Sequence, residues 1–423
     1  MSWNVVLNKF IEIKNAFINK YGVKELYGYD IKKETCLDYW CRKLNNDEFN
    51  DLIKPLQLNE HNDLLLIRYG NYANVFGGEE DVTYDEFWDL YDGFYLECRS
   101  VVINIKKDEL ALTPFKKFRN INECEETSFN NVKDKISQAK CVEFSNKLDG
   151  SMQSARWYDN SVLMAGSMAL NTKDSWRLED GYKMIAKGNY AQMLKDFPSL
   201  TFIFEYISLK DSHVVKYTKD EEGLYLIGIR DTSNGYEYSY KDVLDIARKY
   251  CIKTTELFNK TLDVVMSELD TKKSNEAEGF VLNIDGFKVK IKYNDYVNMH
   301  HVLSAMSSIN LIIKNIADNT FDDMLSKVPQ AYRDRVLKVS NFVFNYIKNT
   351  NKEIDEYYNT APKIDKKNFM IWVNDNVPIN LKGYVRAKYL GNQYNVIKTG
   401  TGKYLRLKDM GMENYSEVFD DGE

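Results

Sequence analysis

The chemistry that this sequence could carry centres on Lys147, which is followed by Leu148, Asp149 and Gly150. An apolar stretch with strand character ends at this lysine, and the glycine lets a backbone approach a ligand closely. A lysine amine attacks as a nucleophile only in its neutral form, which burial and neighbouring positive charges favour. Asp149 could hold either the lysine or a hydroxyl group of a ligand. Because the motif is short, a strand end followed by a turn with an exposed lysine is the alternative interpretation.

Three further lysines alternate with apolar residues between positions 287 and 293. Because successive side chains of a strand point to opposite faces, Lys288, Lys290 and Lys292 would share one face. Like charges about 7 Å apart repel one another unless an anion neutralises them, and a phosphate chain is such an anion. An exposed edge strand that its lysines protect from pairing is the alternative.

Two glutamates, Glu205 and Glu278, lie in or beside apolar stretches with strand character. Burying a carboxylate without a partner is costly, so each should meet a cation, a metal ion or a ligand hydroxyl. For either residue alone, a structural salt bridge explains the pattern as well as a functional role does.

The elements that must position these residues alternate between strands and helices, which predicts an α+β fold with a largely antiparallel sheet. Short apolar runs predict strands at 64–68, 101–105, 141–148, 161–165, 200–207, 224–230, 279–284 and 287–293. Helical spacing predicts helices from Val6 to a stop at Gly22 and at 37–58, 176–194, 241–250, 262–269, 317–328, 332–349 and 366–374.

Three domains follow from these changes in pattern: an N-terminal helical extension over 1–60, a central domain over 61–300 and a mostly helical C-terminal domain over 301–423. Residues 380–409 carry turn signals and some β character, and no helix or strand is predicted there. The acidic tail over 413–423 is expected to be frayed.

Composition excludes several classes of protein. The chain has 423 residues, of which 44% are hydrophobic and 28% charged, and 57 basic against 63 acidic residues give a net charge of −6, so global disorder is excluded. An acidic total also excludes binding to nucleic acid through bulk charge, so such a partner would need a local basic groove. We expect no membrane span and no signal peptide. Six scattered cysteines predict reduced thiols in the cytoplasm, and the four histidines lack the spacing of a zinc site. The familiar phosphate-binding glycine motifs are absent.

In order along the chain, these motifs resemble those of the covalent nucleotidyltransferase superfamily, and within it the phage-type RNA ligase 1 family. Met152 stands where DNA ligases and capping enzymes usually carry an arginine. The matching stretches are Lys147-Leu148-Asp149-Gly150, Phe204-Glu205, Glu278-Gly279, Lys290-Ile291-Lys292, Glu97-Cys98-Arg99, Lys117-Phe118, Asn120-Ile121-Asn122-Glu123 and Asp295-Tyr296-Val297.

The resemblance implies an ATP-dependent RNA ligase. Lys147 would form a lysyl-AMP intermediate, the AMP would pass to an RNA 5′-phosphate, and an RNA 3′-hydroxyl would then displace it. Lys290 and Lys292 would bind the α-phosphate and help to depress the pKa of Lys147. Glu205 would contact the ribose or support metal binding.

The resemblance also implies further site residues and a cofactor. Arg99 and Lys117 would hold phosphates, and Asp149 would take part in nucleotide binding. Tyr296 and Tyr69 are candidates for recognising adenosine or the RNA end, although either could equally be core packing. The resemblance implies Mg²⁺ as cofactor, with Glu278, Asp322 and Asp323 as its candidate ligands.

The sequence departs from the family at two positions. Leu148 replaces a second acid after the nucleophile, and Ala165 replaces a basic residue before Gly166-Ser167. A GTP-dependent capping enzyme, a DNA ligase and a non-catalytic RNA-binding protein are the alternative functions. The expected partner is RNA with single-stranded or nicked ends, including tRNA under repair. The expected protein is a cytoplasmic monomer, located in the host cytoplasm if its source is a phage.

Overall fold

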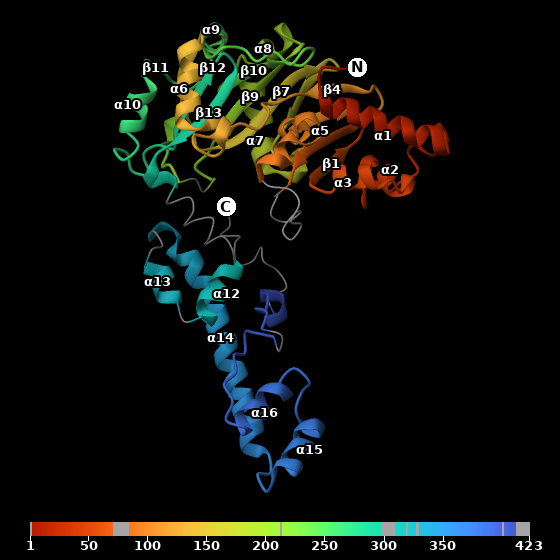
Figure 1. Cartoon of the computed structure of the whole chain (residues 1–423), viewed down its shortest axis with the longest axis vertical. Helices are drawn as coiled ribbons and strands as arrows, with labels where there is room; N and C mark the ends of the chain where they lie inside the picture. The colour runs from red at the N-terminus through yellow and green to blue at the C-terminus, as the bar shows by residue number, and fades with distance from the viewer. Residues whose placement is uncertain are drawn as a thin grey trace. The chain divides into compact units, whose positions relative to one another are not determined.

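The computed structural model describes residues 2–70, 84–211, 214–297, 309–318, 320–326, 330–399 and 402–411. The chain divides into two compact units, 1–296 and 297–423. Figure 1 shows the first unit as sheets flanked by helices and the second as helices. The α+β fold with antiparallel sheets and a helical C-terminal region is therefore confirmed.

The N-terminal segment forms three helices, α1 (Val5–Tyr21), α2 (Cys36–Leu44) and α3 (Asp47–Ile53). Asn4 caps α1 by accepting hydrogen bonds from the amides of Val6 and Leu7, and the helix ends at Gly22 as predicted. The prediction of helix to residue 58 is wrong, because strand β1 (Leu56–His61) begins there. Pro55 has no amide hydrogen to continue a helix, so the chain leaves the helical conformation at this point.

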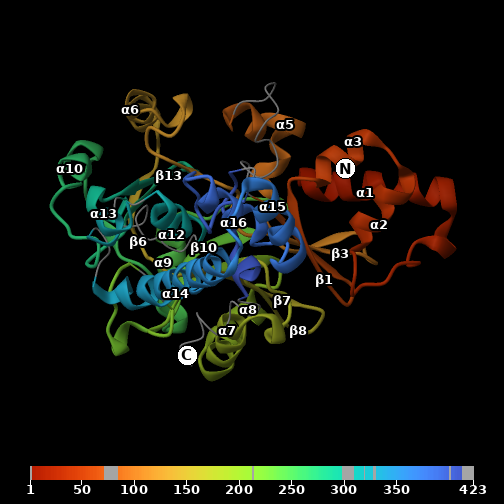
Figure 2. The ribbon, with the colours of Figure 1, turned by 90° about the horizontal axis from the view of Figure 1, so that it is seen from below.

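The first sheet has the strand order β1-β2-β3-β4, with β2 at Leu64–Tyr69, β3 at Arg99–Asn104 and β4 at Glu109–Leu112. Its apolar face shares one core with α1, α2, α3 and α5 (Tyr84–Glu97). Figure 2 shows α1 to α3 gathered beside β1 and β3. The N-terminal helices are therefore part of the core of the first unit.

A second sheet has the order β10-β9-β7-β8. Helices α7 (Trp176–Lys187), α8 (Tyr190–Asp196) and α9 (Tyr240–Tyr250) share its core. The predicted single helix over 176–194 is wrong, because Gly188 separates α7 from α8. The strands are β7 (Ser151–Tyr158), β8 (Ser161–Ala165), β9 (Leu200–Ile207) and β10 (Gly223–Asp231).

The third sheet has the order β11-β6-β12-β13-β5, and only its last pair is parallel among the described strands. Gly279 lies opposite Lys147 on one neighbouring strand and opposite Lys292 on the other. A Cβ atom at Gly279 would lie 2.1 Å from the carbonyl oxygen of Ile291, so only glycine fits there. The strands are β5 (Arg119–Asn120), β6 (Val142–Lys147), β11 (Leu257–Phe258), β12 (Gly279–Ile284) and β13 (Phe287–Lys292). Helices α6 (Phe129–Gln138) and α10 (Leu262–Ser267) also belong to this part of the chain.

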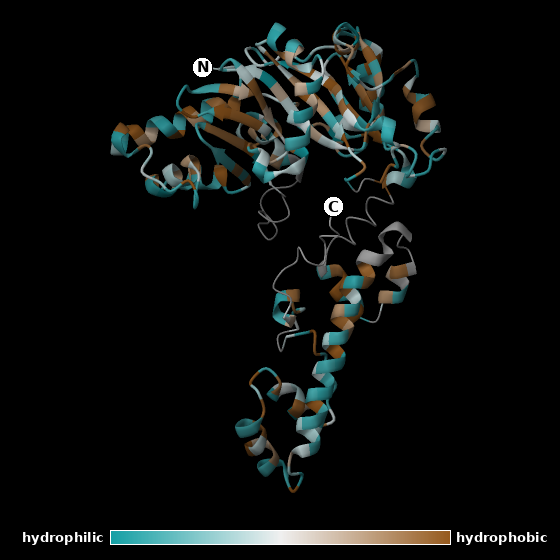
Figure 3. Cartoon of the chain, turned by 180° about the vertical axis from the view of Figure 1, so that it is seen from behind, coloured by the Kyte–Doolittle hydropathy of each residue, from teal (hydrophilic) through white to brown (hydrophobic). Residues whose placement is uncertain are grey.

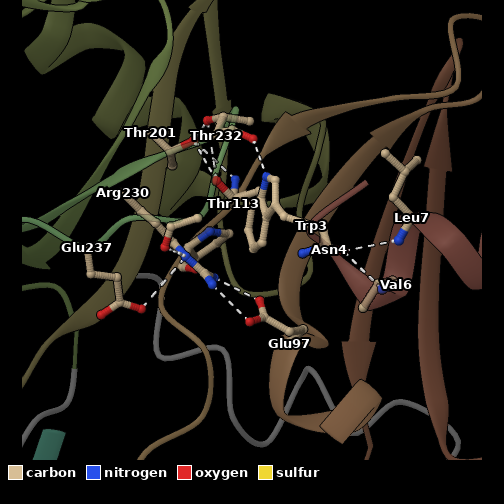
Figure 4. A network of polar contacts seen from close by, with 12 residues as sticks. Trp3, Asn4, Val6, Leu7, Glu97, Thr113, Thr201, Arg230, Thr232 and Glu237 are labelled. Atoms are coloured by element: carbon tan, nitrogen blue, oxygen red, sulfur yellow. Dashed lines mark hydrogen bonds and ion pairs between the residues drawn. The ribbon is translucent and has the colours of Figure 1, made fainter. Parts of the chain in front are cut away.

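A buried polar network joins the N-terminus to the first two sheets (Figure 4). The Trp3 Nε1 atom donates to the carbonyl oxygen of Thr232 at 3.0 Å, and its ring lies 4.8 Å from the guanidinium of Arg230. Arg230 donates to both carboxylate oxygens of Glu97 at 2.8 Å, and its Nε atom lies 3.7 Å from Glu237. These contacts link residue 3 to the end of α5, directly before Arg99.

The second unit is helical, as predicted, and has its own apolar core. In Figure 3 apolar residues are concentrated in the sheets of the first unit, and they alternate with hydrophilic ones along α14. Across the described residues we find no helix that is long and apolar enough to cross a membrane. The helices are α12 (Ile309–Ala317), α13 (Phe321–Ser326), α14 (Gln330–Thr360), α15 (Lys366–Asn376) and α16 (Lys382–Tyr389).

Candidate active site

Lys147, Glu278 and Lys292 meet because their strands are neighbours in the third sheet. Lys147 Nζ donates to Glu278 Oε2 at 2.6 Å, and Lys292 Nζ lies 3.0 Å from Glu278 Oε1. The side chain of Glu278 is only 3% exposed. Burial by itself would raise the pKa of this carboxyl, but the charges and hydrogen bonds of the two lysines hold it below its usual value. Each carboxylate oxygen therefore has a cation as partner.

Lys290 lies between Lys288 and Lys292 on the same face of β13, as the alternation predicts. It has no carboxylate partner among the described residues, and its Nζ atom lies 4.7 Å from the ring centre of Phe118. Burial, followed by the charges of Arg99, Lys147 and other cations, lowers its pKa well below the ordinary value. Lys288 is instead paired with Glu237. Among these three lysines, Lys290 is therefore the one whose positive charge an anionic ligand would stabilise most.

Glu205 faces this group from β9 of the second sheet, and its Oε1 atom accepts a hydrogen bond from the amide of Gly150 at 3.1 Å. Burial raises the pKa of Glu205 to about 7, although the charge of Lys147 opposes that rise. The glutamate therefore exchanges a proton close to neutral pH.

A cavity of about 160 Å³ is lined by residues of the second and third sheets, and Glu278 is not among its lining residues. Its lining includes five residues that the sequence predicted: Arg99, Lys147, Glu205, Lys290 and Lys292. The remaining lining is largely apolar or aromatic and includes Phe115, Phe118, Leu148, Met152, Ile227, Tyr238, Tyr240, Val243 and Val281.

Two buried polar atoms at this cavity have no hydrogen-bond partner in the structure, Arg99 Nη1 and Thr255 Oγ1. Unpaired buried polar atoms are costly, and a ligand with phosphate and base groups would satisfy them. An aromatic and aliphatic wall beside a group of cations suits a nucleotide. The residues therefore fit ATP by their chemistry.

Lys117 lies outside the lining of this cavity. Its Nζ atom is 3.3 Å from Glu123 and 4.2 Å from the ring centre of Trp88. Burial lowers the pKa of Lys117 despite the attraction of Glu123. Its predicted contact with a ligand phosphate is not seen in this arrangement and stays a prediction.

Asp149 and Tyr296 form a separate polar group. The carboxylate of Asp149 accepts hydrogen bonds from the amides of Val214 and Val215 at 2.8 and 3.0 Å and from the Tyr296 hydroxyl at 3.0 Å. Tyr296 is buried and does not line this cavity, although Lys292 Nζ lies 5.2 Å from the centre of its ring. The role of Asp149 and Tyr296 in nucleotide binding stays a prediction.

The other predicted residues are dispersed. Tyr69 lines a second cavity of about 510 Å³ and packs against Trp88 with ring centres 5.0 Å apart. Asp322 is exposed in the second unit, and the side chain of Asp323 lies outside the described residues. The part of the chain that the structure describes holds no group of three or more metal-binding side chains. Mg²⁺ commonly binds through one or two carboxylates together with substrate phosphates. Glu278 and Glu205 fit that pattern.

Sequence reasoning missed Glu143, whose carboxylate lies beside the cavity. It accepts hydrogen bonds from the amides of Tyr240 and Lys241 at 2.8 and 2.9 Å and from Asn283 Nδ2 at 2.8 Å. Glu143 and Lys147 are four residues apart on β6 and therefore face the same side. That spacing was the signal from which Glu143 could have been identified.

Comparisons with known proteins agree with this geometry. Residues 97–296 match the family model described as RNA ligase. A putative RNA ligase from Thermovibrio ammonificans is 24% identical over 285 residues, which cover 62% of this chain and 70% of the relative. Residues 97–296 are therefore similar to the RNA ligase family, in agreement with the resemblance noted in the sequence.

Solved structures of a Naegleria gruberi RNA ligase are also similar. The structure with PPi is 17% identical, with a TM-score of 0.33, and the match covers 44% of this chain and 57% of that one. A mutant solved with ATP and Mn is 15% identical, with a TM-score of 0.35 and coverage of 44% and 58%. The chain thus spans less than two thirds of the length of these ligases.

Proposed function

We propose that this protein joins RNA 5′-phosphate and 3′-hydroxyl ends at the expense of ATP, with Lys147 as the nucleophile. The observation that carries the proposal is the position of Lys147 Nζ, 2.6 Å from Glu278 at a cavity that Arg99, Lys290 and Lys292 also line. A partly buried amine beside several cations and two glutamates suits attack on a phosphate far better than a structural role does.

In the first step, neutral Lys147 Nζ attacks the α-phosphorus of ATP. A phosphorus–nitrogen bond forms, the bond from the α-phosphorus to the bridging oxygen breaks, and pyrophosphate leaves. Arg99, Lys290 and Lys292 stabilise the negative charge that develops on the phosphate oxygens. The proton that Lys147 loses leaves along its hydrogen bond to Glu278 or to solvent.

In the second step, an oxygen of the RNA 5′-phosphate attacks the phosphorus of the lysyl-AMP. The phosphorus–nitrogen bond breaks, and Lys147 regains a proton. In the third step, the RNA 3′-hydroxyl attacks the activated 5′-phosphate, loses its proton and displaces AMP. Glu278 and Glu205 would hold Mg²⁺, which when bound would neutralise charge on the phosphates. Further ligands from Asp322 or Asp323 stay a prediction.

Incubation of the full chain with ATP labelled at the α-phosphate, in the presence of Mg²⁺, tests the proposal. We expect an acid-labile AMP adduct on Lys147, and we expect Lys147→Ala to lose it completely because no other amine replaces the nucleophile. Lys173→Ala is the matched control, since Lys173 is exposed and lines neither cavity. Full labelling of Lys147→Ala would overturn the assignment.

Labelled GTP, assayed in parallel, separates the alternative functions. GMP transfer would indicate a capping enzyme, and absence of any adduct would indicate a non-catalytic RNA-binding protein. Joining of nicked DNA in preference to RNA would indicate a DNA ligase. We further propose a role in RNA or tRNA repair by a cytoplasmic monomer, which ligation assays on tRNA halves, generic oligonucleotides and nicked duplexes would test.

A further inference from the structure

Three arginines border a second cavity of about 510 Å³, which shares the lining residues Arg99 and Met152 with the nucleotide cavity. Arg68 comes from β2, Arg99 from β3, and Arg177 from the first turn of α7. Gly150, the last residue of the nucleophile motif, and Ser151 also line it. We call this space the arginine cavity. Its three cations come from elements that are far apart in the sequence.

The charges of the arginine cavity are only partly balanced. Arg68 has no ion-pair partner among the described residues, and Arg99 Nη1 is buried without a hydrogen-bond partner. Arg177 is paired through two hydrogen bonds with Asp211, and the exposed Asp174 also borders the cavity. Two of the three guanidinium groups therefore lack a carboxylate partner, which suits a phosphate ligand.

An aromatic side chain lies next to these cations at the start of α7. Trp176 is 36% exposed, and its ring centre lies 4.8 Å from the guanidinium of Arg177 and 6.3 Å from the ring centre of Tyr206. Lys210 lies 5.9 Å from the same ring. An exposed aromatic ring among cations is the arrangement on which unpaired nucleic-acid bases stack. Figure 2 shows α7 beside β7 and β8.

The arginine cavity and the nucleotide cavity meet at Arg99 and Met152, which line both. A ligand in the arginine cavity would therefore lie close to an adenylate carried by Lys147. Ala165 leaves the stretch before Gly166 and Ser167 without a cation, yet both of these residues line the arginine cavity. Arg68 and Arg177 supply positive charge there from other elements.

We propose that the arginine cavity binds the 5′-phosphate of the terminal nucleotide of the RNA through Arg68 and Arg99, while the base of that nucleotide lies outside the cavity lining, against the exposed ring of Trp176. Arg177 packs against the ring of Trp176 and adds positive charge to the lining of the arginine cavity. The inference rests on the proposed function, and it assigns the 5′ end of the RNA substrate to the arginine cavity.

Binding and adenylation of the full chain test this inference together. Anisotropy of a labelled single-stranded RNA is measured with a 5′-phosphate and with a 5′-hydroxyl, and lysyl-AMP formation is measured on the same preparations. We expect Arg68→Ala to weaken binding of the phosphorylated RNA about tenfold and that of the hydroxyl RNA much less, because it removes a charge-assisted contact. We expect Trp176→Ala to weaken both RNAs to a similar extent, because stacking does not depend on the phosphate.

Lys173→Ala, an exposed cation on the segment before α7, is the matched control and should bind both RNAs like the parent chain. Normal adenylation by Arg68→Ala shows that the variant folds and that its nucleotide cavity is intact. Equal weakening of both RNAs by Arg68→Ala, or unchanged binding by Arg68→Ala, would overturn the inference. Absence of lysyl-AMP in the parent chain would instead overturn the proposed function.

Discussion

At the scale of single residues, the site depends on one carboxylate shared by two lysines. Glu278 holds Lys147 with one oxygen and Lys292 with the other. This arrangement fixes the direction of the Lys147 amine, because the carboxylate that holds it is itself held by Lys292.

Glu205 should make the stability of the protein depend on pH. Burial raises its pKa from 4.5 in a model peptide to about 7 in the folded chain. A carboxyl whose pKa is higher in the folded state stabilises that state most below pH 4.5, and the advantage is lost as the pH rises through 7. Relative to Glu205→Gln, the free energy of unfolding of the parent chain should therefore fall between pH 5 and pH 8. Urea unfolding at intervals across this range measures the trend.

The exposed Glu256 provides the control for this prediction. Glu256→Gln should leave the pH dependence of the parent chain unchanged, because this side chain is exposed on the surface. The prediction is contradicted if the free energy of unfolding of the parent chain, relative to that of Glu205→Gln, stays constant or rises between pH 5 and pH 8.

At the scale of elements, the register of β6, β12 and β13 brings the reactive side chains together. Gly279→Ala should separate these strands, because the added methyl group would meet the Ile291 carbonyl oxygen at 2.1 Å. We expect a loss of about 2–4 kcal/mol in the free energy of unfolding, the range of strongly disruptive substitutions. Adenylation of Lys147 should fall with it. Chemical denaturation and the labelled-ATP assay measure the two effects.

Gly383→Ala is a suitable control, because a Cβ atom there would meet nothing within 4 Å. In a helix such as α16 this change should stabilise by about 0.5–1 kcal/mol. If Gly279→Ala unfolds at the same denaturant concentration as the parent chain, the steric argument is wrong.

The same elements show what the sequence could and could not reveal. The eight apolar strands were predictable because each is a short apolar run. The shared face of Lys288, Lys290 and Lys292 was predictable because lysines alternate there with apolar residues. β7 was missed, since its start, Ser151 to Ser154, is mostly polar although it pairs centrally between β9 and β8. The Lys147–Glu278 contact spans 131 positions. The two residues meet because β6 and β12 are neighbours in the sheet, and no local sequence pattern specifies this strand order.

At the scale of the whole molecule, the N-terminal extension stabilises the first unit rather than standing apart from it. Its helices share the core of the first sheet, and Trp3 covers the buried Arg230–Glu97 pair. Trp3→Ala should lower the free energy of unfolding by about 1–3 kcal/mol, because it exposes that pair and removes a hydrogen bond. Thermal or urea unfolding measures the loss.

Trp372→Ala, in the second unit, is the control for effects of removing a tryptophan as such. It should lower the stability of its own unit and leave unfolding of the first unit unchanged. If Trp3→Ala leaves both transitions where they were, the extension contributes nothing through this residue.

Arg99 borders both cavities, and this double position has a consequence for turnover. One guanidinium cannot grip a triphosphate and a nucleic-acid terminus at the same moment. If both proposals hold, a high concentration of ATP would favour renewed formation of lysyl-AMP and release of the adenylated RNA before it is sealed. A low concentration of ATP would favour sealing.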